Sequence, residues 1–587
     1  MLPRIDLKQP NRHEAFIMKK ALILVAIFSL FVGIIPSNYA SAANDSASDE
    51  QWPHPNISQP GYQAALFEDH SLTPQARNSW LNAHTGNSVD NCSNMDDSLC
   101  QNAEFVGFNA ILGPCETETQ LDCIEGLTAT KNGASSTGEF SYFYPEQGDA
   151  QFIGSTAKKI PSGLSTSVWK IPSAPHQFGD EYMVLASVNG FARNSETSRL
   201  TGLTLRIIPV SFKENALGKV GGVQMDTLMK RTNSNGQTTI GWGTPASDFG
   251  LFRCVAWESD GSCALQQPFP DNTSYTLMVR LSSTPKAWMH GRMTNPVIDL
   301  DDLGDGASRV SVSASPIKVP TVFGGDFWDD LPSEIQNAYK RGGTYCQPYC
   351  GGRIDWGSQE IPTDPHLLNS WSYPESNKDS SFNELRLWLP VVGDTAVATP
   401  SVWSARTLGL DEMVDADTCF LSGAGIKGIV TSNATVYGAG PPDFNNAEGT
   451  LNYKVAAPHF NPDGSVFKGT YDITMTSDVA RCVYQLGEAP INVNVRVIGE
   501  NGLQTGASTT ATEVDGWLRI SVKDFTFSSP TIKLRITQKK GFKKPKAPQK
   551  VVCLKGGKKK AATGKCPPGA ETVSALKTAT TAKKASR

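Results

Sequence analysis

Apolar and polar residues alternate with a period of two along much of the chain. The clearest runs are SYTLMVRL at Ser274–Leu281, ELRLWLPV at Glu384–Val391, INVNVRVIG at Ile491–Gly499 and IKLRITQ at Ile532–Gln538. Each run puts its aliphatic residues on one side, which predicts a strand with one buried face. Asp-Gly, Asn-Gly and Pro turns separate such runs, so the pattern predicts antiparallel sheets that are wet on one side.

Helical patterns are scarce. The clearest is DDLPSEIQNAYKRGG at Asp329–Gly343, where Pro332 and Ser333 mark the start and Gly342 and Gly343 the end. Trp388 lies out of phase with its aliphatic neighbours, so within a strand it is either exposed or covered by a second layer. Many strands and little helix predict an all-β, multidomain chain of antiparallel β-sandwiches.

Composition shifts suggest where the chain divides. We expect a leader and signal peptide (1–42), an irregular segment (43–90), a β-domain that is one large or two small units (91–312), a β-domain with a short helix and an aromatic-rich stretch (313–412), a β-sandwich (413–538) and a basic tail (539–587). A chain of 587 residues is long enough for several such domains.

The N-terminus has the pattern of an export signal. Met18-Lys19-Lys20 precedes the apolar run at Ala21–Ile35, and Ala40-Ser41-Ala42 is a small-x-small site. We expect cleavage after Ala42, because the run is shorter than the roughly 20 residues of a membrane span. No later segment is predicted to cross a membrane, so the mature chain is expected to be extracellular.

All 12 cysteines lie after this site and fall into sequential pairs. An oxidising compartment favours disulfides. The expected bridges are Cys92–Cys100, Cys115–Cys123, Cys254–Cys263, Cys346–Cys350, Cys419–Cys482 and Cys553–Cys566. Cys346 and Cys350 are also the best candidate for half of a metal site, but no second Cys or His pair has zinc-site spacing.

Charge is distributed unevenly. Residues 539–587 contain 15 Lys or Arg and one acid, Glu571, for a charge of +14, whereas residues 43–538 carry −21. Such blocks are typical of an acidic body with an interaction arm. Phe542 is the tail's only aromatic, so no stacking platform for specific nucleic-acid binding is expected. A solvated, disordered end is the alternative interpretation of the tail.

The tail also carries a motif, Cys553-Leu-Lys-Gly-Gly-Lys-Lys-Lys followed by Gly564-Lys565-Cys566-Pro567-Pro568-Gly569. It resembles the C-terminal lysine-rich cysteine hairpin (C-x-K-G-K…K-C-P-x-G-Y-K-K) of uncharacterised exported actinobacterial proteins. The stretches His290–Ile298, Ser477–Leu486 and Asp515–Gln538 resemble the bodies of the same group. This chain departs after Gly569, where Ala-Glu-Thr replaces Tyr-Lys-Lys. The resemblance implies an exported, surface-associated protein and no particular activity.

No specific catalytic motif is found. HExxH, GxSxG and P-loop patterns do not occur, and the eight histidines are scattered. Asp299–Gly306, DLDDLGDG, is interpreted as a turn between strands, with a weak calcium site as the alternative. The sequence therefore predicts no metal, no cofactor and no catalytic residue.

Two functions are compatible with these patterns. The first is an adhesive or structural surface protein, retained non-covalently on anionic cell-wall polymers or another anionic surface by Lys555, Lys558, Lys559, Lys560 and Lys565. The alternative is a carbohydrate-binding or glycan-hydrolysing protein that uses the aromatic-rich 327–388 region. Its candidate sugar-contacting residues are Trp328, Trp356, Trp371 and Tyr373. Aromatics that simply fill a core are a further interpretation of that region.

Overall fold

The structure is a computed structural model of the full chain. It describes residues 61–68, 79–86, 88–145, 152–193, 196–213, 230–232, 238–240, 254–257, 262–340, 353–355, 370–372, 374–409, 412–414, 416–421, 425–489, 491–499, 502–503, 507–527, 531–538, 550–555, 558–563 and 571–575. The expected signal peptide and its cleavage site lie outside these residues. The described strands form six sheets, which confirms the all-β prediction.

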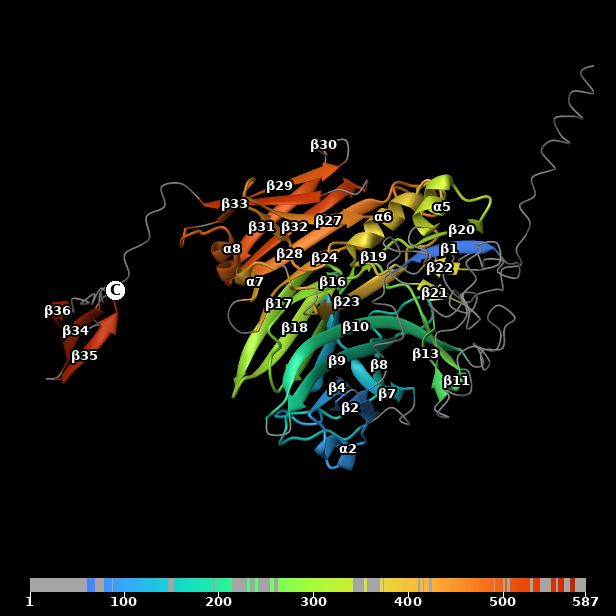
Figure 1. The fold of residues 1–587 in the computed structure, drawn as a ribbon. Helices are drawn as coiled ribbons and strands as arrows, with labels where there is room; N and C mark the ends of the chain where they lie inside the picture. The colour runs from blue at the N-terminus through green and yellow to red at the C-terminus, as the bar shows by residue number, and fades with distance from the viewer. Residues whose placement is uncertain are drawn as a thin grey trace, which may run out of the picture.

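The largest sheet has 16 strands and runs through the middle of the molecule (Figure 1). Its main path is β3 (Ser88–Asn91), β2 (Trp80–Thr85), β4 (Phe105–Ile111), β9 (Glu181–Arg193), β10 (Arg199–Lys213), β23 (Ser401–Thr407), β16 (Ala287–Arg292), β24 (Ile426–Ser432), β28 (Lys468–Thr476), β32 (Trp517–Thr526) and β31 (Ser508–Val514). Off this path lie β7 (Glu139–Tyr144), β8 (Thr166–Lys170), β13 (Cys254–Trp257), β14 (Cys263–Gln266) and β19 (Ile317–Lys318).

Two further sheets pack against this central sheet. The five-stranded sheet has the order β17 (Thr294–Gly304), β18 (Ala307–Ser315), β15 (Thr273–Leu281), β5 (Cys123–Lys131) and β6 (Ala134–Thr137). The six-stranded sheet contains β25 (Val436–Tyr437), β27 (Thr450–Ala456), β33 (Thr531–Gln538), β29 (Ile491–Gly499), β30 (Gly502–Leu503) and, beside β27, β26 (Asp443–Asn445).

Each of these sheets shares a core with the central sheet. Leu277 and Val279 of the five-stranded sheet are buried with Leu205 of the central sheet. Leu534 of the six-stranded sheet is buried with Ile520 of the central sheet. The body is therefore two sandwiches that share one continuous sheet, which is how it buries the apolar side of every alternating strand.

Smaller elements complete the fold. A four-stranded sheet has the order β20 (Val322–Phe327), β1 (Tyr62–Phe67), β22 (Ser370–Ser372) and β21 (Arg353–Asp355); β11 (Lys230–Thr232) pairs with β12 (Thr238–Ile240); and β35 (Lys558–Thr563), β34 (Lys550–Lys555) and β36 (Glu571–Ala575) form a C-terminal sheet. The helices are α2 (Ser98–Gln101), α5 (Ser333–Lys340), α6 (Asp379–Trp388), α7 (Thr418–Leu421) and α8 (Ser477–Val483).

Several local predictions are confirmed. Strand β15 has strictly alternating burial, and β29 and β33 cover the other two aliphatic runs. Helix α5 lies inside Asp329–Gly343. The turn interpretation of Asp299–Gly306 holds for the end of this stretch: Asp299–Gly304 continues β17, and the hairpin to β18 turns at Asp305 and Gly306, with positive φ values of 88° at Gly304 and 79° at Gly306.

The strand predicted at Glu384–Val391 is wrong, because this stretch continues the helix α6. Its buried side consists of Ser381, Glu384, Leu385 and Trp388, which are spaced three and four residues apart. That spacing is the period of a helix, and the apparent alternation of Leu385, Leu387 and Leu389 is coincidental. Trp388 is fully buried and packs in one core with Trp328 and Tyr339.

Pairing of distant strands also goes beyond the expected organisation. β10 pairs with β23, and β16 pairs with β24, so the central sheet runs across the boundaries drawn at 312/313 and 412/413. Two pairs, β16–β24 and β1–β22, are parallel instead of antiparallel. Composition along the chain cannot reveal these contacts, because they join segments that are far apart in sequence.

Candidate functional site

A groove of about 1270 Å³ opens where three loops of the described body meet. The first loop joins β4 to β5 and contains Cys115 and Cys123. The second is the 153–164 segment, and the third is the β17–β18 turn around Asp305. Arg280 and Ser282, from the end of β15, complete the lining. This volume lies above the roughly 300–1,000 Å³ of a typical small-molecule site, so the groove has room for an extended segment.

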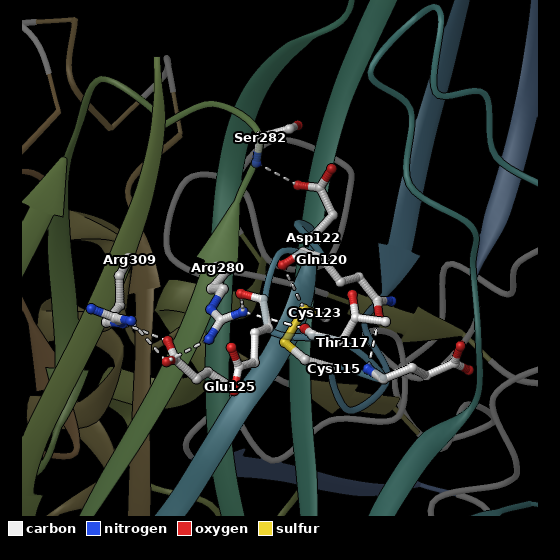
Figure 2. Close-up of a disulfide and its surroundings, with 11 residues drawn as sticks. Cys115, Thr117, Gln120, Asp122, Cys123, Glu125, Arg280, Ser282 and Arg309 are labelled. Carbon is white, nitrogen blue, oxygen red and sulfur yellow. Dashed lines mark hydrogen bonds and ion pairs between the residues drawn. A yellow bond between two sulfur atoms is a disulfide. The ribbon is translucent and has the colours of Figure 1, made fainter. Parts of the chain in front are cut away.

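The first loop is held in place by several bonds. A disulfide joins Cys115 to Cys123, as predicted (Figure 2). The Cys115 amide donates to Ile124 O at 2.9 Å, and the Ile124 amide donates to Gly113 O at 2.7 Å. The Glu116 amide donates to Gln120 Oε1 at 2.6 Å. A loop that is fixed before a ligand arrives loses little entropy on binding.

Arg280 ties this loop to the five-stranded sheet. Its guanidinium donates to the carbonyl oxygens of Thr117 and Glu118 and pairs with Glu125 at 2.8 Å. Arg309, on the neighbouring strand β18, donates from Nη2 to Glu125 Oε1 at 2.9 Å and pairs with Asp301 at 3.1 Å. Figure 2 shows the Glu125 carboxylate between the two guanidinium groups. Hydrogen bonds from Arg309 and then Arg280 lower the pKa of Glu125 to about 2.

Three non-glycine residues in the groove have a left-handed backbone. The φ angles are 55° for Asp122, 53° for Lys159 and 52° for Asp305. Asp tolerates this conformation, but Lys rarely adopts it, and such strain is typical of functional regions. The Asp122 carboxylate accepts a hydrogen bond from the Ser282 amide at 2.9 Å. Burial raises the pKa of Asp122, against the opposing effects of Ser282 and Lys159.

The rim of the groove is apolar and exposed. Leu121, Phe140, Ile153 and Leu303 line it, with exposed fractions of 37%, 39%, 68% and 39%. Phe140 rests on Phe143, with ring centroids 5.0 Å apart. Large exposed apolar side chains gathered at one groove mark an interaction surface more strongly than the same residues scattered over the protein.

The charges of the groove do not cancel. Glu125 and Asp301 offset Arg280 and Arg309. Glu116, Glu118 and Asp305 remain exposed, and within the described part of the chain their carboxylates have no ion-pair partner. With Asp122 and the single cation Lys159, the groove has an acidic surplus over an apolar rim. This combination suits a ligand that is both cationic and partly aliphatic.

A second polar cluster, which we name the central junction, comprises His290, Arg292 and Tyr437 and is sealed from water. Arg292 is 1% exposed and donates to Ser432 O at 3.1 Å and Ala434 O at 2.6 Å. Its guanidinium lies 4.5 Å from the Tyr437 ring centroid, and His290 stacks on the same ring at 3.7 Å. Burial, and then Arg292, lower the pKa of His290. The cluster stabilises the sheet and offers no access to a ligand.

The sugar-binding candidates are not brought together on a described surface. Trp328 is 3% exposed and belongs to a core, so it cannot stack on a sugar. The backbone of Trp371 lies in β22, but its side chain, Trp356 and Tyr373 lie outside the described residues. Tyr339 donates to Glu384 at 3.0 Å inside the same core, which favours the core-filling interpretation of these aromatics.

Four of the five candidate lysines, Lys555, Lys558, Lys559 and Lys560, lie on strands β34 and β35 of the C-terminal sheet. The register of β34 and β35 sets Lys555 opposite Lys558, Leu554 opposite Lys559 and Cys553 opposite Lys560. Lys565 and Cys566 lie outside the described residues, so the bridge from Cys553 stays a prediction. The backbone of this segment forms a three-stranded sheet, which is a different outcome from a wholly disordered end.

The described residues test only three of the six predicted disulfides. Cys92–Cys100, Cys115–Cys123 and Cys419–Cys482 are confirmed. Cys254 and Cys263 lie on the paired strands β13 and β14, but their side chains are outside the described set, as are Cys346 and Cys350.

Sequence reasoning missed the groove. The available signal was the short loop CETETQLDC at Cys115–Cys123, where three acids lie inside a disulfide, together with arginines on two alternating strands. Among the described residues no group of three His, Cys, Asp or Glu side chains is arranged to hold a metal. No helix in the described segments has the length and hydropathy of a membrane span.

The chain matches no protein-family model, and no curated protein or solved structure is significantly similar to it.

Proposed function

We propose that this chain is an exported, surface-associated structural or adhesive protein, held non-covalently at the cell wall by its lysine-rich tail. The observation that carries the proposal is the separation of charge, +14 in residues 539–587 against −21 in residues 43–538. The tail's hairpin register, with Lys555 opposite Lys558, supports it because it gathers cations at one turn.

The binding mechanism is electrostatic avidity. Each exposed ammonium contributes little alone, and many ammonium groups on one short segment act together on a polyanion such as a wall polymer. The attraction is screened within a Debye length of about 10 Å at 0.1 M salt, so retention is salt-sensitive. The body adds three confirmed disulfides, which fit an oxidising compartment.

Cell fractionation tests this proposal. In the test variant the five lysines named above, Lys555, Lys558, Lys559, Lys560 and Lys565, become Gln. In the matched control five body lysines become Gln: Lys131, Lys286, Lys427, Lys454 and Lys468. Wild type and control are expected in the wall fraction and released by high salt, whereas the test variant is expected in the medium. Equal retention of both variants would contradict an electrostatic anchor in the tail.

A further inference from the structure

We propose that the groove beside the Cys115–Cys123 loop binds the lysine-rich tail of a second copy of this chain. This goes beyond wall retention, because it gives the tail a protein partner. The groove presents the unpaired carboxylates of Glu116, Glu118 and Asp305. The tail carries 15 Lys or Arg against one acid, so the two surfaces are complementary in charge.

The lining of the groove combines the two kinds of surface that a lysine side chain contacts. A lysine has an aliphatic stem and a charged tip, and it binds best where apolar surface leads to a carboxylate. Phe140, Ile153, Leu121 and Leu303 supply the apolar surface, and Leu121 and Leu303 belong to the same loop and hairpin as the carboxylates. The groove thus offers apolar surface to the aliphatic stem of a lysine and carboxylates to its ammonium group.

The backbone of the acidic Cys115–Cys123 loop is fixed before a ligand binds. The disulfide and the Arg280 clamp on the Thr117 and Glu118 carbonyls fix the backbone that carries Glu116 and Glu118. Asp305 lies on another element, the turn of the β17–β18 hairpin. The carboxylates are therefore presented from both the loop and the turn. A polyanion is disfavoured, because both groove arginines pair with Glu125 and Lys159 is outnumbered by the carboxylates of Glu116, Glu118 and Asp305.

A second copy is the occupant that the fold favours. The tail follows β33 of the six-stranded sheet, and the groove is built on the five-stranded sheet and the loops beside it. Figure 1 draws β33 in the upper part of the body, while the β17–β18 hairpin extends away from it. A contact between copies joins a tail to a different surface patch, so it is heterologous and can propagate from copy to copy.

The test is sedimentation velocity of the purified full chain over a concentration series at low and high salt, without cell wall. The groove variant is Glu116→Gln, Glu118→Gln and Asp305→Asn. Its matched control removes three exposed carboxylates elsewhere, by Asp96→Asn, Asp271→Asn and Asp515→Asn. Wild type and control are expected to associate at low salt, and the groove variant at least about tenfold more weakly.

A mixing experiment separates this proposal from other modes of association. The groove variant retains its tail, and the tail Lys→Gln variant described above retains its groove. Each alone is expected to be monomeric, while a one-to-one mixture is expected to form heterodimers that grow no further. Unchanged association of the groove variant, a mixture that stays monomeric, or a wild type that stays monomeric at every concentration would overturn the proposal. None of these results depends on binding to a wall.

Discussion

The groove and the central junction are both built around arginine, and they differ in their access to water. At the groove, Arg280 and Arg309 share Glu125 at a partly exposed surface. At the central junction, Arg292 is enclosed and its hydrogen bonds go to backbone carbonyls. The first arrangement positions a loop that leaves carboxylates free, and the second satisfies buried polar groups. The same side chain thus serves binding in one place and folding in the other.

The strands that carry these arginines show the same contrast. In β15 buried and partly exposed residues alternate, so the face that bears Arg280 meets solvent. In β16 all six residues, including His290 and Arg292, are buried, because sheets or helices cover both faces. A polar residue in β16 therefore needs a partner inside the protein, whereas one in β15 can be hydrated.

The largest expected effect is the loss of stability on removing a disulfide, which we compare between the central sheet and the groove. Cys419–Cys482 closes a separation of 63 residues beside the central sheet, and Cys115–Cys123 closes a separation of 8 at the groove. Replacing the long pair by Ala is expected to lower the free energy of unfolding by about 4 kcal/mol, and the short pair by about 2.5 kcal/mol. Chemical denaturation of the two double variants measures both losses. Equal losses would show that loop length does not decide the contribution.

The next effect compares the arginines directly. Arg292→Met leaves the buried Ser432 and Ala434 carbonyls without their donor, and is expected to cost about 3 kcal/mol. Arg309→Met removes a half-exposed partner while Arg280 still pairs with Glu125, so about 1 kcal/mol is expected. Denaturation midpoints of the two variants provide the measurement. A larger loss of stability for Arg309→Met than for Arg292→Met would contradict the interpretation that the central junction serves folding and the groove arginines serve binding.

The smallest effect is a difference in pH dependence. The folded pKa of Glu125 is about 2, below its ordinary value of 4.5. Its stabilisation is therefore present above pH 4.5 and is lost as the pH falls toward 2. Solvent screening limits the contribution to about 1–2 kcal/mol. The stability advantage of wild type over Glu125→Gln is expected to shrink across this window, and an advantage that is constant with pH would contradict the ion-pair assignment.

Asp472, a buried carboxylate on strand β28 of the central sheet, is expected to show the opposite pH dependence. Burial raises the folded pKa of Asp472, so its favourable contribution is present at low pH and is lost as the pH rises through that folded pKa. Relative to Asp472→Asn, wild type is expected to lose stability with rising pH. With rising pH, the stability difference between wild type and Glu125→Gln is therefore expected to grow, and that between wild type and Asp472→Asn to shrink. Denaturation of wild type and both variants over a pH series measures both differences.

Local pattern was sufficient for elements whose burial is one-sided. β15, β29 and β33 were predictable because one face of each is packed and the other meets solvent. Helix α6 was mistaken for a strand because Leu385, Leu387 and Leu389 alternate by chance, while Glu384 is buried through its bond from Tyr339. A buried carboxylate breaks the hydrophobic pattern from which the helix period could have been read.

The groove was not predictable, because its parts are distant in sequence. Arg280 reaches Glu118 across 162 residues, and Arg309 reaches Glu125 across 184. Composition revealed the basic tail, but nothing in the sequence placed an apolar rim beside the acidic Cys115–Cys123 loop. The disulfides were predictable because the nearest cysteines in the chain are also partners in space.

The position of β1 has a consequence for the order in which the chain folds. Tyr62 pairs with Phe327, and Gln63 pairs with Ser370, so both neighbours of this strand come from segments made far later in synthesis. The strand has no partner until those segments leave the ribosome, and closing such long loops slows folding. One of the first strands to be synthesised is therefore one of the last to be paired, and until then both of its edges are exposed to pairing with other segments.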